Sequence, residues 1–439
     1  MENGVPDAGQ LALLAQGYRD LFGDTRLFDG FAATLSGILA SGSTRVRQLA
    51  RAAPKLGVVT HAERRVRRLV SGSNQRTNMN ADTLGARLTR LGAARLAGQD
   101  EVVVILDGSD LRKPHSKVLE HLATVRALDG DLVPGYPTLN ALGISGNGTR
   151  ALLYHRTYSP HMSGYKSDNA LVHDAVNAIV SALRAVGVGR LIFVLDRGYD
   201  DQKLMRLFQK LDVRFVLRAK YDTRSCRLLP TSDDLSLLEA VQNEPVQDSF
   251  DIRRPVSKDG KTKFRLTPAV VRQRQVFIDA GRLRLNVVKL DFNVPRQHDV
   301  QGWMLLTNLP TRHEGGAGAV VRLYLRRWAV EDVFSWTKQA LGWEQVRLLH
   351  FEAIRTLVAL AWIAASFVFS LGEDLNSPTV QLLAHLGGYV PHKNRPPGKK
   401  VLLWGLERLA AALLLEEHRQ DPELRARLDA LSAALFGPQ

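Results

Sequence analysis

The segment EVVVILDGSD, residues 101–110, decides the fold because the character of the chain changes there. Its apolar run from Val102 to Leu106 is typical of a strand that is buried on both faces of a sheet and ends at Asp107. A second segment, RLIFVLDRGYDD at 190–201, repeats the pattern and brings Asp196 directly after an apolar strand. A hairpin and a helix lie between these segments, and a helix and a strand follow, so the sequence predicts an α/β fold.

A third acid lies far along the chain. An aspartate after a strand is most often a turn or helix-capping residue, but two such strands side by side would bring Asp107 and Asp196 together. In YLRRWAVEDVFSWTK, residues 324–338, no Gly or Pro interrupts what is predicted to be one helix. Four polar side chains of that helix fall within roughly 60° of arc on one face. They are Tyr324, Arg327, Glu331 and Lys338.

This polar face has two interpretations. Most charged stripes on helices are solvated surfaces, but Trp328 projects from the same side, where a solvated face has no need of an indole. If the helix packs on the two strands, Glu331 joins the aspartates, and three carboxylates raise one another's pKa unless a cation neutralises them. Magnesium prefers such hard oxygen ligands, and two ions can serve phosphodiester chemistry. The 12 histidines show no paired zinc spacing, and Cys226 is the single cysteine.

The charge balance indicates a nucleic-acid partner. The 439 residues include 59 Lys and Arg against 44 Asp and Glu, a net charge of +15. The densest part, residues 45–68, holds eight basic residues and one acid, Glu63. A solvated helix face is the alternative, but so one-sided an excess repels itself without a counter-anion. The arginines expected to contact DNA are Arg64, Arg65, Arg67 and Arg68.

No membrane is expected as a partner. There is no apolar signal region near residue 1. The longest uncharged run, residues 356–371, is short for a bilayer span and contains two serines, so it predicts a buried core helix. A single cysteine suits a reducing cytoplasm.

The segment at 324–338 also resembles a known motif. Its polar residues match the spacing Tyr-x2-Arg-x3-Glu-x6-Lys without a gap, the hallmark of the DDE transposases of bacterial insertion sequences, specifically the insertion-sequence-four family. Asp107 in VILDGSD and Asp196 in VLDRGYD resemble the first two acids of that family. The resemblance implies that Asp107, Asp196 and Glu331 are catalytic and bind Mg²⁺ at a two-metal site, in which Mn²⁺ would substitute. The residues that it implies as DNA contacts are Tyr324, Arg327 and Lys338.

The resemblance further implies an RNase H-like catalytic core, interrupted before the glutamate helix by a β-rich insertion. Short alternating segments separated by Pro, Gly and Asn agree with an insertion at 221–310. The other predicted parts are a helical basic DNA-binding region at 1–95, the two parts of the core at 96–220 and 311–375, and a C-terminal helical region at 376–439. Dimerisation through the C-terminal region is expected by analogy.

Trp303 opens a strand late in the insertion. The family's hairpin-forming members have a tryptophan at the matching point, which stacks on a base flipped out of the duplex. The alternative is an indole buried within the β-rich part, because Met304, Leu305 and Leu306 follow it.

These features predict a transposase that cleaves the ends of an insertion sequence with Mg²⁺ and joins the freed 3′-hydroxyl to target DNA by a cut-and-paste route. The expected partner is double-stranded DNA, as inverted-repeat ends and as target, bound by a homodimer. The expected location is the bacterial cytoplasm, with the nucleoid when DNA is bound. Two alternatives stay open: a transposase-derived DNA-binding protein without cleavage activity, and an RNase H-like nuclease without strand transfer.

Overall fold

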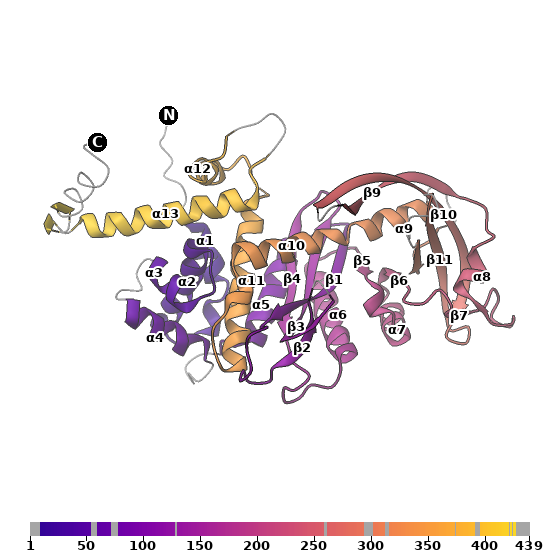
Figure 1. The fold of residues 1–439 in the computed structure, drawn as a ribbon, viewed down its shortest axis with the longest axis horizontal. Helices are drawn as coiled ribbons and strands as arrows, with labels where there is room; N and C mark the ends of the chain where they lie inside the picture. The colour runs from indigo at the N-terminus through magenta and orange to yellow at the C-terminus, as the bar shows by residue number, and fades with distance from the viewer. Residues whose placement is uncertain are drawn as a thin grey trace.

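The molecule has three parts along its long axis: N-terminal helices, a sheet with helices on both faces, and a long β-ribbon at the far end (Figure 1). The computed structural model describes residues 9–426 apart from short gaps. The gaps are 54–58, 72–77, 128–129, 259–260, 294–301, 312–315, 374, 391–395, 421 and 424.

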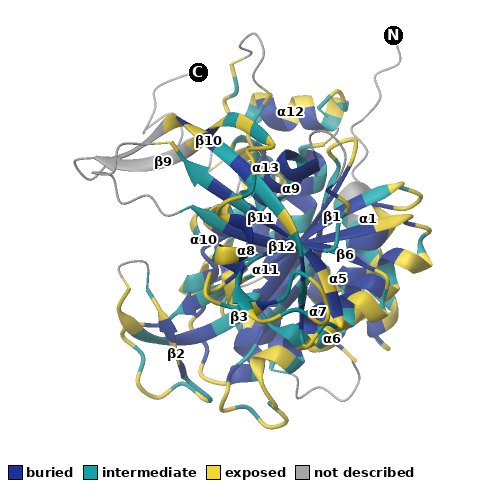
Figure 2. Cartoon of the chain, turned by 90° about the vertical axis from the view of Figure 1, so that its right-hand side faces the viewer, coloured by how far each residue is buried: buried dark blue, intermediate teal, exposed yellow. Residues whose placement is uncertain are grey.

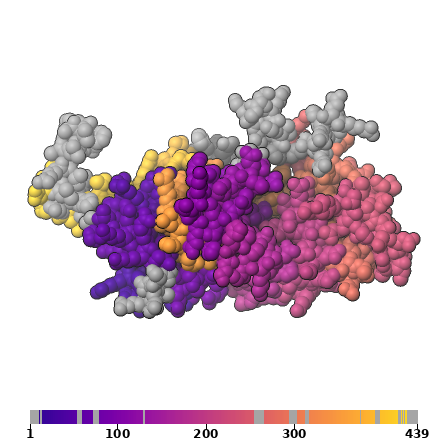
Figure 3. Space-filling model, turned by 60° about the horizontal axis from the view of Figure 1, so that its bottom comes forward, coloured from indigo at the N-terminus to yellow at the C-terminus, as the bar shows by residue number. Residues whose placement is uncertain are grey.

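The N-terminal part is helical. Its α-helices are α1 (Gly9–Gln16), α2 (Thr25–Ser41), α3 (Val46–Ala52), α4 (Val59–Val70) and α5 (Ala81–Ala94). Two of them begin at side-chain caps: Asp24 accepts the backbone N–H of Arg26 in α2, and Asn80 and Thr83 form a capping box at α5. The apolar faces of α2, α4 and α5 pack against α11 (Phe351–Leu371), and α5 also packs directly on strand β4 (Arg150–Thr157) of the sheet. In Figures 1 and 3, α11 in orange lies between α1–α4 and the sheet.

Ten strands of the described residues form one mixed sheet. They are β1 (Glu101–Arg112), β2 (Ala123–Arg126), β3 (Leu132–Ser145), β4 (Arg150–Thr157), β5 (Arg190–Leu195), β6 (Arg214–Arg218), β9 (Asp248–Lys258), β10 (Lys261–Ile278), β11 (Leu283–Phe292) and β12 (Trp303–Thr307). Their order is β2-β3-β1-β5-β6-β12-β11-β10-β9, and β4 pairs with β3. β1, β5 and β6 run parallel, whereas the other neighbours are antiparallel. The mixed α/β class predicted from the sequence is confirmed.

Helices cover both faces of the sheet, so the central strands are largely buried (Figure 2). One core contains α6 (Asp168–Ala185) and α7 (Gln202–Lys210), with the side chains of Val102, Val104 and Leu106 from β1. The opposite core contains α9 (Gly316–Leu325), α10 (Trp328–Ala340) and α11, with Val103 and Ile105. Alternate residues of β1 thus enter opposite cores, as expected for a strand that is buried on both faces.

The strands between 221 and 310 extend this sheet. β12 pairs with β6, and β11, β10 and β9 follow outward as an antiparallel meander, whose last two strands arch over α9 in Figure 1. The same region holds the two-stranded sheet of β7 (Ser225–Cys226) and β8 (Leu235–Ser236), followed by the short helix α8 (Leu237–Val241). The β-rich character predicted for this region is therefore present, in strands that are hydrogen-bonded to the main sheet.

The helix predicted from the uncharged run is α11. By length and composition it is the one described helix that could cross a membrane, but it is buried along almost its whole length inside the protein. It is therefore a core helix. Two more helices follow, α12 (Pro378–Leu386) and α13 (Lys399–Arg419), and α13 extends past the N-terminal helices in Figure 1.

Candidate active site

Two aspartates lie side by side at one edge of the sheet. β1 and β5 are parallel neighbours, and the last pair in their register is Leu106 with Leu195. Asp107 and Asp196 each follow by one residue. β5 ends at Leu195, as predicted, whereas β1 continues to Arg112 by pairing with β3. The prediction that the first strand ends at Asp107 was therefore wrong, because the antiparallel pairing of β1 with β3 extends beyond its parallel pairing with β5.

Both carboxylates face the same side of the sheet. Side chains alternate along a strand, so Asp107 shares its face with the two preceding odd-numbered residues of β1, and Asp196 continues the even-numbered face of β5. The neighbours that define this face pack in the core beneath α9, α10 and α11. They are Val103, Ile105, Ile192 and Val194.

The segment 324–338 is not a single helix. α9 ends just after Tyr324, and α10 begins after Arg327. At the junction, Arg326 donates its N–H to the carbonyl of Leu323 at 3.1 Å and Arg327 donates to that of Tyr324 at 3.0 Å. These bonds to the third preceding residue tighten the chain into a 3₁₀-type turn. The prediction of one helix, based on the absence of Gly and Pro, was wrong.

The turn places two side chains over the aspartates. The Tyr324 hydroxyl donates to Asp196 Oδ1 at 2.9 Å. The Arg327 guanidinium donates to Asp107 Oδ2 and to Glu331 Oε1, both at 2.7 Å, and so joins the first and third acids. The Arg327 and Asp107 side chains are only 12% and 15% exposed, whereas Glu331 is 55% exposed and faces the opening.

The pKa values of Asp107, Arg327 and Tyr324 are shifted by burial and by neighbouring charges. Burial raises the pKa of Asp107 to about 6; Arg327 opposes that rise, and the charges of Asp196 and Glu331 add to it. Burial also opposes the charge of Arg327, but the surrounding carboxylates outweigh it and raise the pKa of Arg327. Burial and the neighbouring Asp196 raise the pKa of Tyr324, so its phenol stays protonated and acts as a donor.

This geometry has a counterpart among known families. The family model of the transposase DDE domain matches residues 98–367, more than half of the chain. The chain belongs to the transposase DDE domain family. Membership implies nuclease and transesterase activity on DNA, so DNA is the partner of this DDE transposase. The match begins just before β1 and ends within α11, and it therefore contains Asp107, Asp196 and Glu331.

DDE transposases generally use divalent metal ions, and the chemistry of the acids here fits such an ion. Asp107, Asp196 and Glu331 carry three negative charges, and among the side chains that bond them Arg327 supplies one positive charge. The remaining charge is what a divalent cation would balance. As they stand, no three acidic, His or Cys side chains of the described residues form a ready metal cluster. Arg327 bridges Asp107 and Glu331 instead, so a metal held by both acids would require Arg327 to release at least one of them.

Lys338 lies one step away from the three acids. Its Nζ contacts Asp110 Oδ1 at 2.5 Å and Glu344 Oε1 at 3.5 Å, and Arg112 Nε donates to the same Glu344 oxygen at 3.0 Å. The structure therefore brings Tyr324 and Arg327 to Asp196, Asp107 and Glu331 and gives Lys338 a separate pair of acidic partners.

An aromatic cluster flanks the site on the β12 side. Trp303 opens β12 and is partly buried. Its ring meets Tyr324 edge-on at 5.3 Å between centroids, Phe292 at 5.6 Å and Trp328 at 6.3 Å. The indole of Trp328 on the polar face thus packs beside Trp303, next to the residue that holds Asp196.

The predicted N-terminal arginines lie on α4, on the other side of α11 from the sheet (Figure 1). Their side chains are all exposed, while Ala62, Val66, Leu69 and Val70 bury the opposite face of the helix. The exposed residues are Arg64, Arg65, Arg67 and Arg68.

Three neighbours of the site were not predicted from the sequence. Burial raises the pKa of Tyr199 far above its usual value, and the charges of Asp107 and Asp196 add to the rise, so its hydroxyl lies beside the acids. Its place in DRGYDD, three residues after Asp196, was the available signal. Asp110 and Glu344 gave no such signal, because their contacts with Lys338 depend on the folded arrangement.

Proposed function

We propose that this DDE transposase serves an insertion sequence of the insertion-sequence-four family, cutting the element ends and joining the freed 3′-hydroxyl to target DNA by a cut-and-paste route. The observation that carries the proposal is the adjacency of Asp107 and Asp196 on parallel strands, with Glu331 joined to them through Arg327. The strand order β4-β3-β1-β5-β6 supports the RNase H-like core that the resemblance implies.

Each side chain of the site then has a role. Asp107, Asp196 and Glu331 would hold Mg²⁺, or Mn²⁺ in its place, and the metal would supply an activated oxygen nucleophile and would stabilise the leaving oxygen. Tyr324 orients Asp196 by its hydrogen bond. Arg327 balances the acids before DNA arrives and is positioned to contact the scissile phosphate when it releases them.

The central test replaces the acids without changing their shape. Asp107→Asn, Asp196→Asn and Glu331→Gln should each abolish nicking of end-containing DNA in Mg²⁺, while end binding in EDTA stays near the wild-type level. Asp222→Asn, a change at an exposed aspartate after β6, is the matched control and should nick normally. Nicking at the wild-type rate by any of the three variants would remove that residue from the site.

The same substrates separate the two alternative functions. A wild-type protein that binds ends but never nicks them would be a DNA-binding derivative of a transposase. One that nicks but never joins a pre-cut 3′-hydroxyl end to a second DNA would be a nuclease. Strand transfer by the wild-type protein, lost in Asp107→Asn, is the result expected here.

End recognition is assigned to the exposed face of α4. Replacing Arg64, Arg65, Arg67 and Arg68 with Ala should flatten the plot of log affinity against log salt by about 0.9 for each lost phosphate contact. Arg282→Ala, on the turn between β10 and β11, is an exposed control. An unchanged slope in the α4 variant would make this face a solvated surface.

Trp303 is assigned to base stacking on the β12 side of the site. Trp303→Ala should cost about 1–3 kcal/mol of stacking and reduce the fluorescence change of 2-aminopurine near the cut. An unchanged fluorescence response with a much lower melting temperature would make Trp303 a core residue, as its contacts with Phe292 and Tyr324 would allow.

Dimerisation on DNA is assigned to α13. Leu413 and Leu415 are each 52% exposed on this helix, where apolar side chains have little protein around them. Leu413→Glu with Leu415→Glu should shift the DNA-bound protein from dimer to monomer in analytical ultracentrifugation. A dimer that survives both changes would place the interface elsewhere.

A further inference from the structure

An open groove of about 960 Å³ begins at the catalytic acids and runs away from the tryptophans. It lies between β1 and β3 on one side and the C-terminal half of α10 on the other. Glu331 and Gly108, the neighbour of Asp107, line its inner end. Most of the other lining residues are polar or charged.

A DNA strand that presents a phosphate to the acids must continue in both directions. On one side of Glu331 it meets Trp303 and Trp328. On the other side the groove is continuous with the site, because Glu331 lines both. A polymer held at Asp107 therefore has a path along Gly108 and Ser109 into the groove.

The charges in the groove are balanced before DNA arrives. Three cations line it, of which Arg126 is exposed, and three acids oppose them. The cations are Arg112, Arg126 and Lys338, and the acids are Asp110, Glu331 and Glu344. Asp110 and Glu344 occupy the sides of Lys338 where phosphate oxygens would bind, so a strand must compete with them.

An aromatic face completes the groove. Tyr158 lines it and is partly exposed. Tyr165 lies parallel to Tyr158, with 8° between the ring planes and 6.4 Å between centroids. Asp168 at the start of α6 holds both hydroxyls, accepting from Tyr165 at 2.9 Å. The ring of Tyr158 is therefore fixed at the groove wall, and a rigid aromatic face is what an unpaired base stacks on.

We propose that this groove binds the unpaired DNA strand that continues beyond the scissile phosphate. Tyr158 stacks on one of its bases, Arg126 and Lys338 contact its phosphates, and Asp110 competes with the strand for Lys338. The proposal rests on the proposed transposase function. It adds a second substrate-binding surface, on the side of the site opposite Trp303.

The first test measures binding in EDTA, where no cleavage occurs. The probes are a blunt duplex carrying the element end and the same duplex with a short unpaired thymidine overhang at the cut position. Wild type should bind the overhang probe more tightly. Tyr158→Ala should lose that preference by about tenfold, the equivalent of stacking one base, while Tyr158→Phe keeps it. Equal preference in wild type and Tyr158→Ala would overturn the proposal.

A second variant guards against misfolding. Arg126 is exposed, so Arg126→Ala should fold normally, weaken binding of the overhang probe and leave blunt-duplex binding unchanged. Arg282→Ala is again the control. An Arg126→Ala protein that binds both probes as wild type does would exclude a strand from the groove.

The third test is a gain of binding. Asp110→Asn removes the competing charge and should tighten overhang binding several-fold without changing the blunt probe. Weaker binding would instead mean that Asp110 positions Lys338 for DNA, and the proposal that Asp110 competes with the strand for Lys338 would be wrong. These binding measurements do not depend on nicking. A protein that never nicks DNA but shows the expected overhang preference would therefore contradict the proposed function and still support strand binding in the groove.

Discussion

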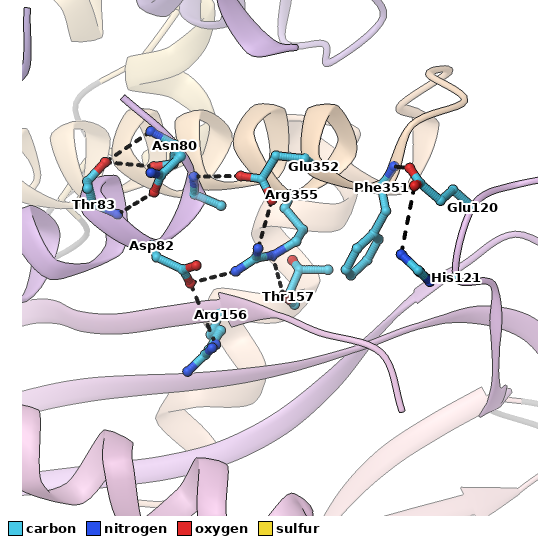
Figure 4. Close-up of polar contacts among 11 residues, drawn as sticks. Asn80, Asp82, Thr83, Glu120, His121, Arg156, Thr157, Phe351, Glu352 and Arg355 are labelled. Atoms are coloured by element: carbon cyan, nitrogen blue, oxygen red, sulfur yellow. Dashed lines mark hydrogen bonds and ion pairs between the residues drawn. The ribbon is translucent and has the colours of Figure 1, made fainter. Parts of the chain in front are cut away.

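Two buried arginines each hold two carboxylates, yet their surroundings differ. Arg327 joins Asp107 and Glu331 at the edge of the sheet where β1 and β5 are parallel neighbours, and its Nε is buried without a hydrogen-bond partner among the described residues. Arg355 of α11 joins Glu352 and Asp82, at 2.8 and 2.5 Å, where the start of α5 meets α11. Its Nε donates to the carbonyl of Thr157 at 3.0 Å, so all three of its nitrogens are bonded (Figure 4).

The Arg355 site is a joint between parts of the molecule. Asp82 belongs to the N-terminal helices, Thr157 to the sheet and Glu352 to α11, and Figure 4 shows all three converging on one guanidinium. Glu352 also accepts the backbone N–H of Ala81 at 3.3 Å. A buried charge is tolerable when it is paired and hydrogen-bonded, and each nitrogen of Arg355 has a partner, so this arginine stabilises one arrangement.

The Arg327 site has the opposite character. Its acids outnumber its cations, one nitrogen is unpaired, and the pKa of Asp107 is raised to about 6. Unsatisfied charge of this kind is expected where a ligand completes the site. We therefore expect Arg327 to act in catalysis and Arg355 to stabilise the fold. Substituting each arginine tests this contrast.

The largest expected effect is on catalysis at Arg327. Arg327→Met should lower the cleavage rate about 10²–10³-fold, the usual cost of removing one donor that stabilises transition-state charge. Its melting temperature should fall less than that of Arg355→Met, because Asp107, whose pKa is already raised, can take up a proton once Arg327 is gone, and Glu331 is 55% exposed to solvent. Single-turnover nicking beside thermal unfolding measures both. A large fall in melting temperature would make Arg327 a structural residue like Arg355.

The next effect is on stability at Arg355. Arg355→Met should cost about 3 kcal/mol, because it leaves the Thr157 carbonyl unpaired and two acids without their cation. Arg190→Met is the control, since the exposed pair of Arg190 with Glu101 should be worth less than about 1 kcal/mol. Urea unfolding gives both values. Normal stability with slow nicking in Arg355→Met would reverse the assignment.

The sequence predicted more of the sheet edge that holds Asp107 and Asp196 than of the joint at Arg355. Apolar runs before Asp107 and Asp196 carry the strand signal locally, and the motif spacing placed Glu331 with them. The break at Arg327 was missed because no local residue demands it. It is associated with tertiary bonds from Tyr324 to Asp196 and from Arg327 to Asp107. No local pattern links Asp82 to Arg355 across 273 positions.

The remaining prediction concerns the polar chain behind the joint. Thr157 contacts His155 Nε2 at 3.2 Å, His155 Nδ1 lies 2.7 Å from Asn140 Oδ1, and Asn140 Nδ2 donates to Thr138 at 3.0 Å. Burial, with Arg355 adding, lowers the pKa of His155 to about 3. The ring is therefore neutral in the native state. It donates from Nδ1 to Asn140 and accepts from Thr157, and all donors in the chain point one way.

This neutral histidine makes the joint sensitive to acid. Below about pH 6.5 the unfolded chain binds a proton at His155, and the native state does not until about pH 3. His155 therefore costs no stability above pH 6.5. Below that pH, it lowers the free energy of unfolding by about 1.4 kcal/mol for each pH unit.

His155→Gln tests the size and sign of this effect. The stability gap between wild type and His155→Gln should shrink by about 1.4 kcal/mol between pH 7.5 and 5.5, because only the wild type has this group to protonate on unfolding. A His155→Gln gap that is the same at both pH values would mean that native His155 takes up its proton normally. The joint would then resemble the Arg327 site, where a charge has no partner in the described part of the protein.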